Sequence, residues 1–292
     1  MILSVSLGNS LQYDAPLLEK EYPLRVEDAQ SRTRHIFAQI IKSAKEKNWE
    51  SLPIGECIGN IGLLMTGTEY VAGTIEAEGP EICRVDFTGL DCVTFYENVL
   101  CTARILKKGK TTYDDLIAEL TLTRYRGGKL TDYTSRLHYT SDWIYDNEKK
   151  KVVRNITKKI GGKEYPVEVS FMSKNPGYYQ ALKEFPEFIK TIAKFEKEIN
   201  KRRHWYIPKR KVRKAQRHIR TGDIIVLATN REGLDYAHTG LAYRDEKGKV
   251  RFLHASSEKK KVMLDTELYK YIQPVETFIG ITVARPQEVR YP

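Results

Sequence analysis

Apolar residues recur with helical spacing in several separated parts of the chain. Near the beginning, Phe37, Ile40, Ile41 and Ala44 fall on one side of a period of about 3.6 residues, which is typical of an amphipathic helix packed on a core. Later segments carry a comparable pattern. Together they predict helices over residues 26–49, 93–105, 112–125, 135–147 and 180–203.

Other segments are extended and apolar, and they predict strands. Leu241 and Tyr243 alternate with small residues, the polar residues 245–248 form a turn signal, and Val250 and Phe252 continue the alternation. This pattern predicts a β-hairpin. The remaining strand-like segments are residues 82–87, 151–156, 165–171, 223–228 and 278–283.

The length and composition favour one large domain. The chain has 292 residues, of which 41% are hydrophobic, so it can bury a full core and lies near the upper size of a single domain. Predicted helices followed by a mainly antiparallel sheet indicate an α+β fold. We predict a single domain over residues 1–292, with an N-terminal helical part (26–80), a strand–helix unit (81–106), a large helical insertion (107–220) and a β-sheet part (221–292).

Cys92 occupies the start of the predicted helix that follows the extended residues 82–87. Unpaired backbone N–H groups and the positive end of the helix dipole lie there, and both favour a thiolate. The same N–H groups can donate to an oxyanion that forms when the sulfur attacks a carbonyl. Asp91 precedes the helix and is predicted to be its N-cap rather than a catalytic acid.

His238 and His254 lie on the two arms of the predicted hairpin. They are separated by 254 − 238 = 16 residues, and because the chain folds back through one turn they can lie side by side. A cysteine nucleophile needs an imidazole to move its proton, and that imidazole needs a partner that fixes its tautomer. The hairpin can supply both groups, so the sequence predicts a thiol hydrolase.

The other cysteines do not indicate a metal site. Cys57, Cys83, Cys92 and Cys101 include no pair with the two-residue spacing of zinc ligands, so structural zinc is not expected. Cys101 lies nine residues after Cys92 and is about half a turn out of phase, so it should face the core. The sequence leaves open a disulfide between Cys57 and Cys83.

Several segments in their joint order resemble a known family. They are Leu90-Asp91-Cys92-Val93-Thr94-Phe95, Ser135-Arg136-Leu137-His138-Tyr139, Asp142-Trp143-Ile144, Tyr206-Ile207-Pro208, Thr221-Gly222-Asp223-Ile224, Gly233-Leu234-Asp235, His238-Thr239-Gly240 and His254-Ala255-Ser256. The chain, from about residue 26 to its end, resembles the N-acetylmuramoyl-L-alanine amidase-like family, a branch of the NlpC-type papain-like cysteine peptidases. The resemblance implies a papain-like core in which the nucleophile helix packs on the sheet.

The resemblance also implies a reaction and a site. Cys92 would be the nucleophile, His238 the general base and acid, and His254 the third, orienting member. The substrate would be the amide between N-acetylmuramic acid and L-alanine in peptidoglycan fragments, and no metal or other cofactor is required. The insertion is the expected source of specificity. Residues assigned to substrate binding are Arg136, His138, Tyr139, Trp143 and Tyr206.

Two alternative functions remain open. Relatives in the wider superfamily cut peptide stems, so an endopeptidase acting within the stem is one. The other follows from charge: the chain has a net charge of +11, and residues 201–220 are rich in Lys and Arg without an acidic residue. Such a tract, with Trp205 and Tyr206 inside it, is typical of contact with a nucleic acid or another anionic polymer. The sequence does not indicate an oligomeric state.

We infer the cellular location of the protein from its expected substrate rather than from a targeting signal. Residues 1–7 are apolar but lack a basic flank and the length of a signal-peptide core, and no segment is long enough to span a membrane. A cell-wall substrate leads us to expect export to the periplasm or envelope, with a targeting segment absent from this sequence. Cytoplasmic recycling of wall fragments is the alternative.

Overall fold

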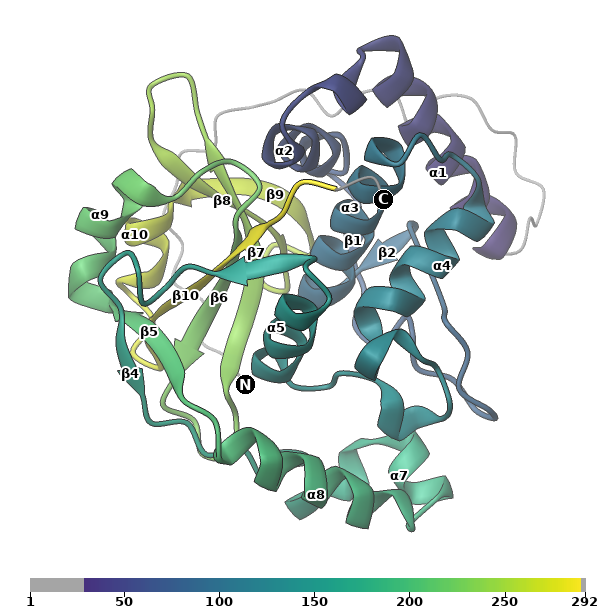
Figure 1. Ribbon diagram of the computed structural model, residues 1–292, viewed down its shortest axis with the longest axis vertical. Helices are drawn as coiled ribbons and strands as arrows, with labels where there is room; N and C mark the ends of the chain where they lie inside the picture. Colours follow the sequence, from purple (N-terminus) through teal and green to yellow (C-terminus); the bar gives the residue numbers. More distant parts are fainter. Residues whose placement is uncertain (1–28, 290–292) are drawn as a thin grey trace.

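A mixed, mainly antiparallel sheet with helices on both faces forms the centre of the protein. The computed structural model describes residues 29–289, and within them the strands follow the order β2-β1-β9-β8-β7-β6-β10-β5-β4, with β3 also pairing with β10. Figure 1 shows α2, α3 and α5 on one side of the sheet and α9 and α10 on the other. The predicted α+β class with a helix on an antiparallel sheet agrees with this arrangement.

The strands are short at the edges and long in the centre. Their bounds are β1 Glu69–Tyr70, β2 Gly89–Leu90, β3 Val153–Asn155, β4 Lys163–Tyr165, β5 His204–Pro208, β6 Ile224–Thr229, β7 Tyr236–Arg244, β8 Val250–Ser256, β9 Lys261–Glu267 and β10 Phe278–Pro286. The α-helices are α1 Ala29–Glu46, α2 Ile54–Leu64, α3 Cys92–Lys107, α4 Tyr113–Arg124, α5 Thr140–Lys149, α6 Phe171–Lys174, α7 Gln180–Glu184, α8 Phe188–Asn200, α9 Val212–Ala215 and α10 Leu268–Ile272.

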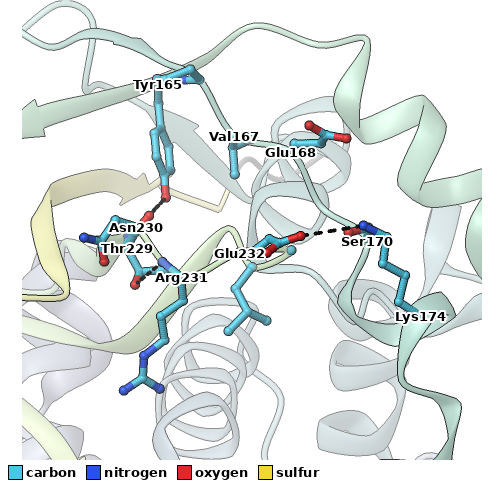
Figure 2. Close-up of a pocket in the computed structure, with 12 residues that line it drawn as sticks. Tyr165, Val167, Glu168, Ser170, Lys174, Thr229, Asn230, Arg231 and Glu232 are labelled. Carbon is cyan, nitrogen blue, oxygen red and sulfur yellow. Dashed lines mark hydrogen bonds and ion pairs between the residues drawn. The ribbon is translucent and has the colours of Figure 1, made fainter.

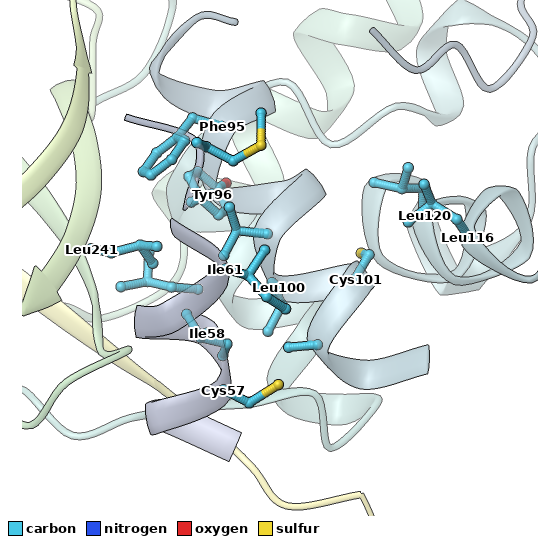
Figure 3. Close-up of a cluster of buried hydrophobic side chains, with 14 of the residues drawn as sticks. Cys57, Ile58, Ile61, Phe95, Tyr96, Leu100, Cys101, Leu116, Leu120 and Leu241 are labelled. Carbon is cyan, nitrogen blue, oxygen red and sulfur yellow. The ribbon is translucent and has the colours of Figure 1, made fainter. Parts of the chain in front are cut away.

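Strand alternation divides the core between the two faces of the sheet. Leu241 and Leu253 belong to the large cluster that includes α2, α3 and α4, whereas Ala242 and Phe252 belong to a second cluster with α9 and α10. Figure 3 shows α3 held between α2, α4 and the strand that carries Leu241. This packing fixes the helix that begins at Cys92.

The structure confirms several predicted elements. Helices α1, α3 and α4 and strands β6 and β10 lie where the patterns predicted them, and the hairpin β7–β8 turns at residues 245–248. Residues 26–28 of the first predicted helix lie outside the described residues, as do residues 1–7.

Other predictions were wrong. Residues 82–87 are not a strand, and β2 is only Gly89–Leu90. The helix predicted over 135–147 begins at Thr140, because residues 136–139 are extended or irregular. The helix predicted over 180–203 is two helices, with Pro186 between them, since proline removes a backbone donor. Strand β4 ends at Tyr165, so most of the segment 165–171 is irregular.

The long segment between the cysteine and the histidines joins the same sheet and core. Its strand β3 pairs with β10, and its β5 pairs with β10 and β4. Helix α4 packs on α3, while α7 and α8 lie at one end of the molecule (Figure 1). The segment is therefore bound to both halves of the candidate site. No helix among residues 29–289 is long and apolar enough to cross a membrane.

Candidate active site

Cys92 is the first residue of α3 and its side chain is half-buried. The carboxylate of Asp91 accepts hydrogen bonds from the backbone N–H groups of Val93 and Thr94, at 2.9 and 2.8 Å. The hydroxyl of Thr94 accepts one in return from the N–H of Asp91, at 2.9 Å. This reciprocal capping confirms the predicted N-cap role of Asp91 and fixes the backbone that carries the thiol.

The thiol of Cys92 is protonated at neutral pH. Burial raises its pKa to about 12, and the negative charge of Asp91 raises it further, while backbone N–H groups of Thr239, Cys92 and Val93 act in the opposite direction. The backbone N–H groups at the helix start favour the thiolate, as predicted, but desolvation outweighs them. A nucleophile at this position needs a base that takes its proton during the reaction.

His238 and His254 form a directly bonded pair. Nε2 of His238 lies 2.7 Å from Nδ1 of His254, and the rings meet edge to face with their centroids 4.9 Å apart. His254 is fully buried, whereas His238 is half-buried. Burial is the main cause that lowers the pKa of each imidazole, so both are neutral at pH 7.

Gly240 allows the two strands to approach at this point. A Cβ atom added to it would lie 2.7 Å from Cβ of His254 and 2.7 Å from the carbonyl oxygen of Leu253. Any larger residue would displace β8 and with it His254. Sterically, only a residue without a side chain fits at the glycine of the His238-Thr239-Gly240 segment.

The histidine strand is joined to the cysteine helix next to His238. The hydroxyl of Thr239 donates to the carbonyl oxygen of Cys92 at 2.9 Å. The backbone N–H of Thr239 also favours the thiolate of Cys92, so it lies beside the sulfur. The residue that contacts Cys92 is thus the immediate neighbour of the predicted base.

Sequence reasoning missed two residues at the histidine pair. Asp265, on β9, places Oδ2 3.4 Å from Nε2 of His254. Tyr271, on α10, places its ring 5.0 Å from that of His254 and 6.5 Å from that of His238. Neither β9 nor α10 was predicted, so no pattern connected these side chains with the hairpin.

Four of the five residues assigned to substrate binding do not share one helical face. Because α5 begins only at Thr140, Arg136, His138 and Tyr139 precede the helix and only Trp143 lies within it. Arg136, Tyr139 and Trp143 are buried, and His138 is half-buried.

Each of these four side chains has partners inside the protein. Arg136 forms ion pairs with Glu76 and Glu81. Nε2 of His138 lies 2.9 Å from the carbonyl oxygen of Tyr133, and burial followed by the charge of Arg136 lowers the pKa of this histidine to about 3.

Tyr139 and Trp143 are hydrogen-bonded to buried glutamates. Tyr139 donates to Glu196 at 2.8 Å, and Trp143 donates through Nε1 to Glu97 at 2.9 Å. These contacts give both residues a structural role.

Tyr206 lies in an aromatic group at the end of the sheet. Its ring is 5.1 Å from that of Tyr165, which is 6.0 Å from that of Tyr236. Tyr206 is buried, but Tyr165 also lines a cavity of about 220 Å³. Tyr206 therefore packs against a residue that lines this cavity, without lining it itself.

The cavity lies between the segment after β4 and the loop between β6 and β7 (Figure 2). Arg231 extends its guanidinium from that loop, and Lys174 approaches Glu232 at 3.9 Å on the opposite wall. The cations Arg231 and Lys174 and the carboxylate of Glu232 thus share its rim. The loop leads directly into β7 and His238.

The remaining cysteines and histidines lie away from the histidine pair. Cys57 and Cys101 are buried in the apolar cluster (Figure 3), and Cys101 is within 3.2 Å of the Thr123 hydroxyl, as its predicted core position requires. Cys57 and Cys83 are free thiols. His204 is buried in β5.

The basic segment 201–220 contains β5 and α9 and is only partly available to an anionic polymer. Arg202 pairs with Asp142 at 2.5 Å, and Lys209 donates to the carbonyl of Val275 at 2.9 Å. The fully exposed cations of the second half are Arg210, Lys211, Arg213, Lys214, Arg217 and Arg220.

The fold and the site together define the class of protein. A capped helix presents a thiol beside a strand that carries one of two bonded imidazoles, in an α+β chain. Chemically, a thiol and a neutral imidazole pair arranged in this way can support nucleophilic hydrolysis. A family model described as N-acetylmuramoyl-L-alanine amidase-like matches residues 60–281, and the chain belongs to this family.

Solved structures agree with the assignment. An N-acetylmuramoyl-L-alanine amidase from Bacteroides uniformis is 32% identical, with a TM-score of 0.76, over 80% of this chain and 99% of that one. A Bacteroides fragilis structure, provisionally named a xylanase, is 35% identical, with a TM-score of 0.72, over 77% and 98%.

A more distant structure shares the fold. A Legionella pneumophila protein is 20% identical, with a TM-score of 0.66, over 88% of this chain and 95% of that one. No curated protein sequence matches the chain significantly. Family membership supports, as the class of activity, a hydrolase that acts on an amide of peptidoglycan.

Proposed function

We propose that the protein is a cysteine amidase with a papain-like, NlpC-type core that cleaves the amide between N-acetylmuramic acid and L-alanine in peptidoglycan fragments. The observation that carries the proposal is the His238–His254 pair, which adjoins Cys92 through Thr239. Family membership supplies the substrate class. Cys92 is the proposed nucleophile, His238 the base and acid, and His254 the orienting residue.

The first half of the reaction forms a thioester. Nδ1 of His238 takes the proton of the Cys92 thiol as the sulfur attacks the lactyl carbonyl. The carbonyl oxygen becomes an oxyanion, and the N–H groups at the start of α3 are suitable donors to it. The C–N bond then breaks, and His238 returns its proton to the departing amine of L-alanine.

The second half releases the sugar. Water attacks the thioester carbonyl while His238 takes one of its protons, and the sulfur leaves as the C–S bond breaks. The proton on His238 restores the Cys92 thiol. The products are free N-acetylmuramic acid and an intact peptide, and His254 holds the His238 ring throughout.

The cavity beside the β6–β7 loop is the proposed site for the peptide stem. Stem peptides carry carboxylates, and the exposed Arg231 together with Lys174 offers positive charge at the rim. Tyr165 lines the cavity, and Tyr206 packs against Tyr165. This assignment moves the expected specificity from residues 136–143 to the segments 165–174 and 229–234.

The test is mass spectrometry of products after incubation with N-acetylmuramoyl-L-alanyl-D-isoglutamine and with a longer muramoyl peptide. We expect free N-acetylmuramic acid and intact peptide from the wild type and none from Cys92→Ser. Cleavage within the stem would instead establish the endopeptidase alternative. No cleavage of either compound contradicts the proposal.

The proposed substrate also bears on location. Peptidoglycan is met in the periplasm or envelope, which family membership favours, and its fragments are also met in the cytoplasm during recycling. We also propose that the exposed cations around α9 contact an anionic polymer of the cell wall. This contact predicts tighter association with intact wall at low salt than at high salt.

A further inference from the structure

The histidine pair continues to a carboxylate. Nδ1 of His254 faces His238 at 2.7 Å, and Nε2, on the opposite edge of the ring, faces Oδ2 of Asp265 at 3.4 Å. Asp265 lies on β9, next to β8 in the sheet, and is about one-fifth exposed. The three side chains form a row that begins at His238, whose neighbour Thr239 is hydrogen-bonded to Cys92, and ends at Asp265 on β9.

We propose that Asp265 is a positioning residue of the active site, which fixes the tautomers of both histidines and balances the charge that forms on them. This inference rests on the proposed function of Cys92 and His238. It adds a fourth member that neither the sequence nor the family match assigned.

The argument follows the proton along the row. A carboxylate only accepts, so Nε2 of His254 must carry a proton toward Asp265. Neutral His254 then has a bare Nδ1, which can only accept from Nε2–H of His238. His238 in turn is left with a bare Nδ1, and that is the nitrogen the proposed mechanism needs as its base.

The same row responds when the base becomes charged. As His238 takes the thiol proton it becomes an imidazolium in a desolvated site, which is unfavourable without a counter-charge. Asp265 supplies that charge through His254. Burial lowers the pKa of His254, and the contact with Asp265 opposes this lowering; the same contact, against the effect of desolvation, lowers the pKa of Asp265.

Other charged or titratable groups around the pair act less directly. They are Cys92 on α3, Tyr271 on α10, Glu258 before β9, and Arg251, which donates to the backbone carbonyl of Asp265 at 2.6 Å. Glu258 also opposes the lowering of the pKa of His254 by burial, but less strongly than Asp265 does. Asp265 is the carboxylate that is hydrogen-bonded to a histidine of the pair.

The test compares Asp265→Asn with Asp265→Glu, and uses Glu267→Gln as a matched control. Glu267 lies on the same strand, and its ion pairs are with Lys249 and Lys270, away from the histidines. Asparagine can donate to Nε2 of His254 and so select the opposite tautomers. We expect kcat to fall about 10- to 100-fold with KM little changed, with partial recovery in Asp265→Glu and no change in Glu267→Gln.

A second measurement does not depend on the substrate. The rate of alkylation of Cys92 by iodoacetamide, mapped by mass spectrometry between pH 5 and pH 10, reports proton transfer to His238. In Asp265→Asn we expect slower alkylation near neutral pH, because the imidazolium has lost its counter-charge. The acidic limb of kcat/KM should also move to lower pH, since the histidine pair then protonates less readily.

The outcomes separate the two proposals. If the wild type cleaves no muramoyl peptide, the proposed function fails, and the alkylation profile still decides the role of Asp265. Wild-type alkylation and pH profiles in Asp265→Asn, with unchanged kcat wherever turnover is measurable, would overturn the positioning role. A loss of equal size in Glu267→Gln would overturn it too.

Discussion

The hydroxyl of Thr239 donates to the carbonyl oxygen of Cys92 at 2.9 Å and so ties the histidine strand to the first turn of α3. Thr239→Val keeps the shape but removes this bond, so we expect unfolding to become easier by about 1 kcal/mol and kcat to fall at least tenfold. Thr102→Val is the control, because Thr102 donates to the carbonyl of Asn98 within α3, at 2.8 Å. Urea unfolding and product assays on both variants check this, and equal kcat values would contradict it.

Cys92→Ser should abolish product release and leave the fold intact, because a serine hydroxyl is not activated by the same neutral imidazole pair. Cys83→Ser, at another half-buried thiol, should remain active. In the wild type, iodoacetamide should label Cys92 before Cys101, which is fully buried and whose pKa is also raised. Full activity of Cys92→Ser, or the reverse labelling order in mapped peptides, would contradict the assigned roles.

Loss of the base His238 should lower kcat more than loss of its orienting partner His254. His238→Ala removes the group that moves the proton, and the expected fall in kcat is about 100- to 10,000-fold. His254→Ala leaves His238 in place without a fixed tautomer, so a measurable fraction of the activity should remain. Steady-state kinetics on the muramoyl dipeptide would show the order, and a larger loss in His254→Ala would reverse the assignment.

Asp91→Asn should make the thiol of Cys92 more acidic. The amide oxygen can keep the helix cap, but the negative charge that raises the pKa of Cys92 is gone. Each pKa unit lost gives about tenfold more thiolate near neutral pH, so alkylation of Cys92 should accelerate. Asp132→Asn, which changes a different cap, should leave the rate unchanged. Slower alkylation in Asp91→Asn would show that the cap rather than the charge dominates.

The buried pair of Glu97 and Arg124 should be important for stability. The Nε atom of Arg124 lies 2.7 Å from Glu97, whose other oxygen accepts from Trp143, and all three side chains are buried. Arg124→Met leaves a buried carboxylate without its counter-charge, so we expect the free energy of unfolding to fall by about 3–5 kcal/mol. The exposed pair of Lys201 and Glu198 offers a control: Lys201→Met should change stability by less than about 1 kcal/mol. Urea titrations would measure both.

Local signals made much of the site predictable. Asp91 precedes an apolar helical period, which is enough to predict a cap and a cysteine at the first turn. The alternation on both sides of residues 245–248 predicts a hairpin, and the hairpin brings His238 and His254 together. In each case residues close in sequence determine the geometry.

The features that were missed depend on contacts between distant segments. Asp265 meets His254 only through the register of β8 and β9, which contains an irregularity between Arg251 and Leu253. The protonation of Cys92 depends on burial by residues from several elements. The helix predicted over residues 135–147 was wrong at its start, because helical spacing was extended upstream of the true start of α5. Pro186, by contrast, already marked the break between α7 and α8.

The two halves of the site differ in when they can form during folding. The hairpin of β7 and β8 closes over a short turn, so the histidine pair needs only local contacts. The bond from Thr239 to Cys92 spans 147 positions and requires the intervening segment to enter the sheet first. A nascent or partly folded chain can therefore hold its imidazoles together long before it has a nucleophile beside them, and catalytic competence arrives only with the completed fold.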